Sequence, residues 1–196
     1  RASGNRDGVD RFTVVGPVTK TKHQTLAAYH TRMGARLQKF DVLAVARRPR
    51  ERLLSMYFSP HRWMRKNDAG AYEVTPASEI TFDEEQFCAM VASVPTIGHY
   101  LDQDALSEPL SLDRPIRHAS GARVHLWAYD DMGAMLTRLG TTFGLPSIGM
   151  PVPVNQSAHA PLKAQVLAER ADRISQIIQD SAHADDEALF KESPSI

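Results

Sequence analysis

The residues best placed to do chemistry are three arginines and a serine close to a proline. Arg47 and Arg48 follow an apolar run, and Pro49 opens a segment that carries Arg52 and Ser55. Proline suits the first position of a helix, because the N–H it lacks would have no partner there. A helix start offers unpaired N–H groups and a partial positive charge, to which guanidinium groups add fixed charge. The spacing therefore predicts an anion-binding site, and phosphate fits guanidinium groups well.

A solvated basic helix start without any ligand would show the same charge pattern. Glu51 stands between Arg50 and Arg52 and can partly neutralise both of them. Charge alone leaves both interpretations open, so the order of the neighbouring residues has to decide between them.

A strand and a helix must position these side chains. Residues 42–46 form an apolar run that indicates a buried strand at about 41–46, and a helical pattern follows over 49–58. Residues 122–129 alternate like a second strand. Further helices are expected from Thr25, from a capping box at 81–84, from Asp130 to a stop at Gly144, and from Pro161. Strands that alternate with helices predict an α/β fold with a mainly parallel sheet.

Length and charge limit the class of protein. The chain has 196 residues, with 23 Lys and Arg against 23 Asp and Glu, and a single cysteine. One domain of this length needs no disulfide or metal to fold. Zero net charge argues against nucleic acid as a partner. The lone cysteine fits a reducing compartment, and no apolar run approaches the ~18 residues of a membrane span, so we expect a cytoplasmic location.

The segment from Val45 to Phe58 resembles the 3′-phosphate-binding segment of sulfotransferases, in particular the membrane-type carbohydrate sulfotransferases and their bacterial relatives. Their pattern is a hydrophobic strand, Arg-Asn-Pro or Arg-Asp-Pro, a further arginine, and Leu-x-Ser-x-Tyr-Phe. This chain reads VARRPRERLLSMYF and departs from it at Arg48. The resemblance implies a P-loop NTPase-like three-layer fold that uses 3′-phosphoadenosine-5′-phosphosulfate (PAPS). It also implies that Arg47 and Ser55 hold the 3′-phosphate and that Arg52 supports the site.

Two more blocks extend the resemblance. His23, in the segment KHQTL, stands where the family carries the proposed general base for sulfuryl transfer. By its surroundings alone, His23 is either a base or a solvated capping residue. The segment VNQS is similar to a family segment near the nucleotide, which makes Asn155 and Ser157 expected cofactor contacts, although a plain connector would look the same. His159, just beyond it, is expected at the surface.

The family's 5′-phosphosulfate loop, Pro-Lys-Thr-Gly-Gly/Ser-Thr-Ser, does not occur in the sequence. The nearest match, VTKTK at 18–22, lacks the glycine that lets N–H groups wrap closely around a phosphate. Either this loop precedes residue 1 or the chain is a degenerate family member that has lost the loop. Because the chain begins without Met, we expect the N-terminal strand, this loop and its catalytic lysine to lie before residue 1. Residues 1–196 are then expected to form a single sulfotransferase-like domain without them.

The sequence thus predicts a sulfotransferase that moves a sulfuryl group from PAPS to a hydroxyl of a carbohydrate or another small acceptor. Transfer would be in line, with His23 as base. Residues 59–78 and 99–120 are the expected acceptor-facing segments, because they are irregular and rich in aromatic and charged groups. The histidines and Cys88 show no metal-ligand spacing, so no metal is expected. Two alternatives stay open: a P-loop kinase-like phosphotransferase, and a non-catalytic nucleotide-binding or scaffold protein.

Overall fold

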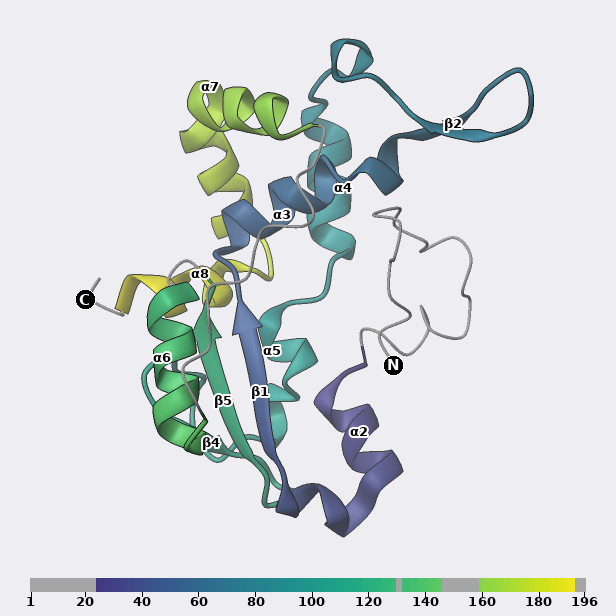
Figure 1. The fold of residues 1–196 in the computed structure, drawn as a ribbon. Helices are drawn as coiled ribbons and strands as arrows, with labels where there is room; N and C mark the ends of the chain where they lie inside the picture. Colours follow the sequence, from purple (N-terminus) through teal and green to yellow (C-terminus); the bar gives the residue numbers. More distant parts are fainter. Residues whose placement is uncertain (1–23, 130–131, 146–158, 193–196) are drawn as a thin grey trace. The chain divides into compact units, whose positions relative to one another are not determined.

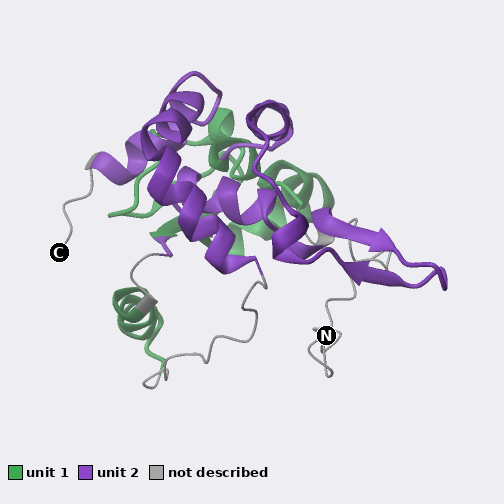
Figure 2. Cartoon of the chain, turned by 90° about the horizontal axis from the view of Figure 1, so that it is seen from above, with its two compact units in different colours: residues 1–46, 97–127, 132–155 green, residues 47–96, 128–131, 156–196 purple. Residues whose placement is uncertain are grey.

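The computed structural model describes residues 24–129, 132–145 and 159–192. They form mixed α/β structure (Figure 1). The chain divides into two compact units that alternate along the sequence, coloured green and purple in Figure 2. Unit 1 takes Arg1–Ala46, Ile97–Trp127 and Met132–Asn155, and unit 2 takes Arg47–Thr96, Ala128–Asp131 and Gln156–Ile196. The single domain expected from the sequence stays a prediction.

Unit 1 contains a three-stranded sheet in the order β1, β5, β4. In Figure 1, β1 (Asp41–Ala46) and β5 (Arg123–Ala128) point the same way, so this pair is parallel. In contrast, β4 (Ile116–Arg117) pairs antiparallel with β5. The α/β class predicted from the sequence is therefore confirmed, and the sheet formed by the described residues is small and mixed.

The two longer strands differ from their predicted burial. β5 was expected to alternate, but four consecutive residues, 124–127, are buried, because β5 is the central strand and both of its faces are covered. β1 was expected to be buried, yet Leu43 and Val45 are 46% and 49% exposed. Leu43 and Val45 stand two positions apart, so they share one face of β1, and that face is only partly covered.

An ion pair ties the first residue of β1 to β5. The Asp41 carboxylate accepts hydrogen bonds from Arg123 Nη2 at 3.0 Å and from His125 Nε2 at 3.1 Å. The Arg123 guanidinium holds the pKa of Asp41 below its ordinary value, against the opposing effect of burial. These bonds add register-specific contacts to the parallel pair of strands.

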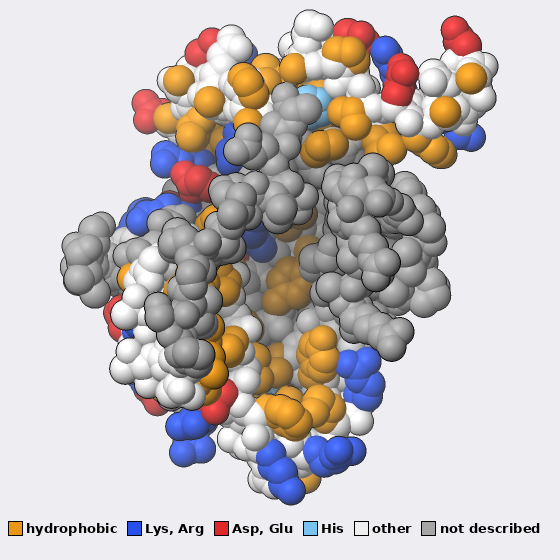
Figure 3. Space-filling model, viewed as in Figure 1, with side chains coloured by type: hydrophobic (Ala, Val, Ile, Leu, Met, Phe, Trp, Pro, Cys, Tyr) orange, Lys and Arg blue, Asp and Glu red, His pale blue; other side chains and the backbone are white. Residues whose placement is uncertain are grey.

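The helices of unit 1 precede, separate and follow its strands along the chain. They are α2 (Leu26–Met33), the 3₁₀ helix η1 (Gly34–Lys39), α5 (Ile97–Tyr100), the 3₁₀ helix η4 (Gln103–Ala105) and α6 (Met132–Phe143). The N-cap of α2 is Thr25, where the sequence predicted the helix start, and its hydroxyl accepts the Ala28 N–H at 3.2 Å. α6 stops where predicted, because Gly144 adopts a positive φ of 61°. Basic side chains of α2 and η1 lie at the surface (Figure 3) and do not enter the core.

Unit 2 is mainly helical. Its helices are α3 (Pro49–Tyr57), α4 (Glu84–Ser93), α7 (Ala160–Gln179) and α8 (Ala184–Glu192), with short 3₁₀ turns η2 (Pro60–Trp63) and η3 (Ala77–Glu79). α3 packs against α4 and α7. The apolar faces of these helices form one buried core: Leu53, Leu54, Tyr57, Phe58, Ile80, Phe87, Met90, Val91, Val166, Ile174, Ile177 and Ile178. Each such fully buried side chain contributes roughly 1.5–3 kcal/mol, so this core holds α3 in place.

Three local details of unit 2 differ from the sequence expectation. α4 is capped by Asp83, whose Oδ1 accepts the Gln86 N–H at 2.9 Å, and not by Thr81. The supposedly irregular segment 59–78 contains a hairpin of β2 (Met64–Lys66) and β3 (Tyr72–Val74), with Arg65 opposite Glu73. Arg170 interrupts the regular backbone of α7 (φ −132°, ψ 23°).

No helix within the described ranges has the length and apolar character needed to cross a membrane.

Candidate anion-binding site at the start of α3

The candidate site begins where the chain leaves β1 and enters α3. Arg48 is the N-cap residue of α3 and has φ −49° and ψ 135°, the extended conformation favoured before a proline. Pro49 takes the first helical position, as predicted, and is buried. No side chain makes an N-cap hydrogen bond here. The first turn of α3 therefore keeps the partial positive charge of a helix N-terminus.

Lys163, from α7, completes the site. Its Nζ donates to the hydroxyl oxygen of Ser55 at 2.7 Å and to the backbone carbonyl of Glu51 at 3.3 Å. The close packing of α3 against α7 brings this amine to a position two turns into α3. The structure thus places an ammonium group beside the serine that the sequence singled out.

The electrostatics of Lys163 indicate that positive charge accumulates here. Burial lowers the pKa of Lys163, and the nearby charge of Arg47 lowers it further. The Glu51 carboxylate opposes both effects, but it also pairs with Arg50 Nε at 3.2 Å. An anion bound between Arg47 and Lys163 would relieve their repulsion and restore the pKa of the amine.

Arg47 is held by an aromatic ring. Its guanidinium carbon lies 3.9 Å from the centroid of the Tyr129 ring, a cation–π contact. Among the described residues, no acidic side chain forms an ion pair with Arg47 within 4 Å. Stacking on Tyr129 uses the flat face of the guanidinium, so its N–H edge can still fork onto oxyanion oxygens.

Arg52 makes a different set of contacts. Its Nη2 lies 3.3 Å from Asp186 Oδ2 and 3.1 Å from His183 Nδ1, both on or beside α8. Its Nη1 donates to the Pro95 carbonyl at 3.2 Å. The side chains of Asp186 and His183 are only 4% and 0% exposed. Arg52 therefore joins α3 to α8, and its predicted part in cofactor binding stays a prediction.

The other predicted site residues are His23, Asn155 and Ser157. All three lie outside the described residues, so their roles stay predictions. The neighbouring expectation for His159 was wrong, because this residue is 1% exposed. Its ring nitrogens lie 3.1 Å from the carbonyl oxygen of Phe58 and 3.0 Å from that of Thr75. His159 packs at the start of α7 because the chain returns there to the C-terminal end of α3.

Lys163 is the site residue that the sequence reasoning missed. It follows Leu162 and precedes the buried Val166 by one helical turn, so it borders the apolar stripe of α7. A lysine in that position usually extends its amine into solvent. Only the position of Ser55 on the facing helix shows that the amine turns inward.

The comparisons with known proteins add no relative. No family model, curated protein or solved structure matches this chain. Within the ranges that the structure describes, no group of three or more His, Cys, Asp and Glu side chains is arranged to hold a metal ion.

Proposed function

We propose that the start of α3 binds the 3′-phosphate of PAPS and that the protein is a PAPS-dependent sulfotransferase. The observation that carries the proposal is the hydrogen bond between Lys163 Nζ and Ser55 Oγ, next to Arg47. Arg47 precedes the first turn of α3, and the Lys163 amine and the Ser55 hydroxyl lie beside its second turn. That combination favours a compact anion with several acceptor oxygens.

A terminal phosphate monoester suits this site better than a singly charged anion. Its two negative charges can offset both Arg47 and Lys163, while its oxygens accept from the Ser55 hydroxyl and the guanidinium. The resemblance to sulfotransferases independently assigns Arg47 and Ser55 to such a 3′-phosphate. The parallel β1–β5 pair and the strand-to-helix order of 41–57 support the P-loop-like architecture that belongs to this proposal.

The proposed reaction transfers a sulfuryl group in line. The oxygen of an acceptor hydroxyl forms a bond to sulfur, the bond between sulfur and the phosphate oxygen breaks, and adenosine 3′,5′-bisphosphate leaves. His23 takes the hydroxyl proton. Arg47, Ser55 and Lys163 contribute by orienting the donor from its 3′ end. The acceptor is a carbohydrate or another small hydroxyl compound, and no metal is required in this scheme.

Thermal unfolding with added ligands tests the nucleotide assignment. We expect adenosine 3′,5′-bisphosphate to raise the melting temperature, and adenosine 5′-monophosphate or ATP with Mg²⁺ to do so much less. Lys163→Ala should lose the shift, whereas Arg173→Ala, which removes a surface cation of unit 2, should keep it. Stabilisation by ATP with Mg²⁺ alone would instead favour a kinase-like enzyme. If no nucleotide stabilises the protein, the scaffold alternative is favoured.

The catalytic proposal needs its own measurement. Sulfate transfer from radiolabelled PAPS to a panel of carbohydrate acceptors should require His23, so His23→Ala should lower the rate about 10²-fold or more while ligand-induced stabilisation persists. An unchanged rate in His23→Ala would remove this residue from the mechanism without affecting the nucleotide site.

A further inference from the structure

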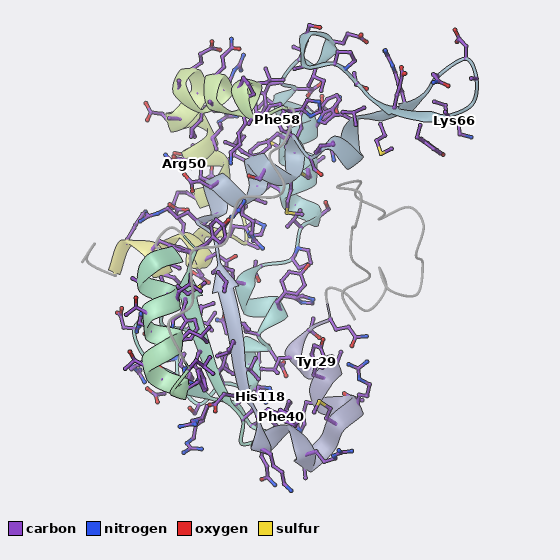
Figure 4. The ribbon with its side chains drawn as sticks, in the orientation of Figure 1. Tyr29, Phe40, Arg50, Phe58, Lys66 and His118 are labelled. Atoms are coloured by element: carbon purple, nitrogen blue, oxygen red, sulfur yellow. The ribbon has the colours of Figure 1, made fainter. Side chains whose placement is uncertain are left out.

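Unit 1 contains a second group of reactive side chains, far in sequence from the start of α3. Asp102, His118 and Ser120 form a continuous hydrogen-bonded chain. The Asp102 Oδ2 lies 3.1 Å from His118 Nε2, and His118 Nδ1 lies 2.8 Å from Ser120 Oγ. The His118 side chain, labelled in Figure 4, is 0% exposed, while Ser120 is partly exposed. A carboxylate, an imidazole and a reachable hydroxyl in this order are the components of an activated serine.

The backbone holds the three residues in this arrangement. His118 follows β4 and its N–H donates to the Ala122 carbonyl at 2.9 Å, while the Gly121 N–H donates back to the His118 carbonyl at 2.8 Å. Asp102 adopts a φ of 55°, and it is the only described residue other than glycine with a positive φ. That conformation costs free energy. Here it directs the carboxylate of Asp102 to the imidazole.

The hydrogen bonds determine which nitrogen of His118 carries the proton. The backbone N–H of Ser120 donates to Nδ1 at 3.1 Å, so Nδ1 presents a lone pair. The proton is then on Nε2, where the Asp102 carboxylate accepts it. The ring is also packed edge-on against His30, at 5.4 Å between centroids. A neutral imidazole fixed in this tautomer has its basic nitrogen at the Ser120 hydroxyl.

We propose that Ser120 is a nucleophile, activated by His118 and Asp102, that reacts with small carboxylic esters. Ser120 Oγ bonds to the carbonyl carbon of the ester while its proton passes to His118 Nδ1. The bond from that carbon to the alkoxy oxygen then breaks, and the alcohol leaves with the proton, so that the acyl group stays on Ser120. The oxygen of a water molecule then bonds to the acyl carbon, the bond from that carbon to Ser120 Oγ breaks, and the carboxylic acid leaves while Ser120 regains its proton. This site is independent of the proposed nucleotide site.

Gln38, near the end of η1, packs against the turn that carries Ser120. A Cβ on Gly121 would lie 3.1 Å from Gln38 Cβ and 3.7 Å from Gln38 Oε1, so the Gln38 side chain covers the turn that follows Ser120. This contact limits access to the Ser120 hydroxyl from that side of the turn. The absence of a side chain at Gly121 is what permits this approach.

A fluorophosphonate reagent tests the proposal directly, because it forms a phosphorus–oxygen bond with an activated serine and expels fluoride. Intact-protein mass spectrometry of the full chain should show one adduct, mapped to Ser120 by peptide analysis. Ser120→Ala should abolish the adduct, and Asp102→Asn should slow labelling about tenfold or more. Asparagine tolerates the positive φ, so this variant keeps the backbone.

Ser107→Ala is the matched control, since Ser107 is an exposed serine of the same unit. It should label as fast as the unmodified protein. Circular dichroism confirms that each variant is folded. Absence of labelling, or a labelling rate that is unchanged in Ser120→Ala or in Asp102→Asn, overturns the proposal and leaves the three residues as a structural brace for the turn.

Discussion

Arg47 and Arg52 stand five positions apart in one basic motif, yet they occupy different environments. Arg47 stacks on the Tyr129 ring and shares its surroundings with a lysine. Arg52 faces the buried carboxylate of Asp186 and the ring of His183. The charge pattern of the sequence does not distinguish these two arginines. Arg52 has a carboxylate partner within the protein, whereas Arg47 forms no ion pair among the described residues and is proposed to bind an external anion.

The largest expected difference is in folding stability. Arg52→Ala removes the guanidinium that neutralises the nearly buried Asp186 carboxylate, so it should lower the free energy of unfolding by about 3–5 kcal/mol. Arg47→Ala should change it by less than about 1 kcal/mol. Urea unfolding followed by circular dichroism measures both. Equal losses in the two variants would contradict the distinction between them.

For nucleotide affinity, we expect the larger effect from Arg47→Ala and the smaller effect from Arg52→Ala. Arg47→Ala should weaken binding of adenosine 3′,5′-bisphosphate about ten- to a hundredfold, because a hydrogen bond to a charged group contributes about 1.5–3 kcal/mol. Arg47→Lys keeps the charge but loses the fork, and an intermediate affinity is expected. Isothermal titration calorimetry provides the values, with Arg173→Ala as the charge control. An unchanged affinity in Arg47→Ala would exclude Arg47 from the site.

Binding should also be linked to the protonation of Lys163. Burial and the charge of Arg47 lower the pKa of the amine without ligand, and a bound phosphate would raise it. Between those two pKa values the complex holds more protons than the separate components. Binding therefore takes up protons there, and affinity falls as pH rises through the lowered pKa. Above about pH 7 the phosphate is already dianionic, so the lysine dominates this dependence.

Calorimetry in two buffers with different ionisation enthalpies measures this proton uptake from about pH 7 to about pH 10. Lys163→Gln should abolish it. Uptake that persists in Lys163→Gln would assign the linked proton to another group and would separate Lys163 from the site.

The smallest expected effect is at Tyr129. Tyr129→Leu removes the ring on which Arg47 stacks, a contribution of about 0.5–1 kcal/mol, so affinity should fall about two- to fivefold. Tyr129→Phe keeps the ring and should retain the affinity. If Tyr129→Leu binds as tightly as the unmodified protein, the stacking contact does not orient Arg47.

Several local features could be predicted from the sequence because short-range interactions decide them. The strand at 41–46 and the helix that starts at Pro49 are both observed, as are the helix from Thr25 and the stop at Gly144. Hydrophobic periodicity, proline at a first helical position and glycine at a positive φ all act within a few residues. The cap of α4 was misplaced by two residues, since Thr81 and Asp83 are both good caps and only the backbone angles distinguish them.

The sequence by itself thus determined that a strand leads through two arginines into a helix that starts at Pro49, and it predicted an anion site there. The tertiary structure decided which side chains face that position. Lys163 reaches Ser55 across 108 positions of sequence, and Asp186 reaches Arg52 across 134. Such contacts arise when α7 and α8 bury their apolar faces beside α3. Hydrophobic burial is non-directional, so no local pattern specifies which polar groups it brings together.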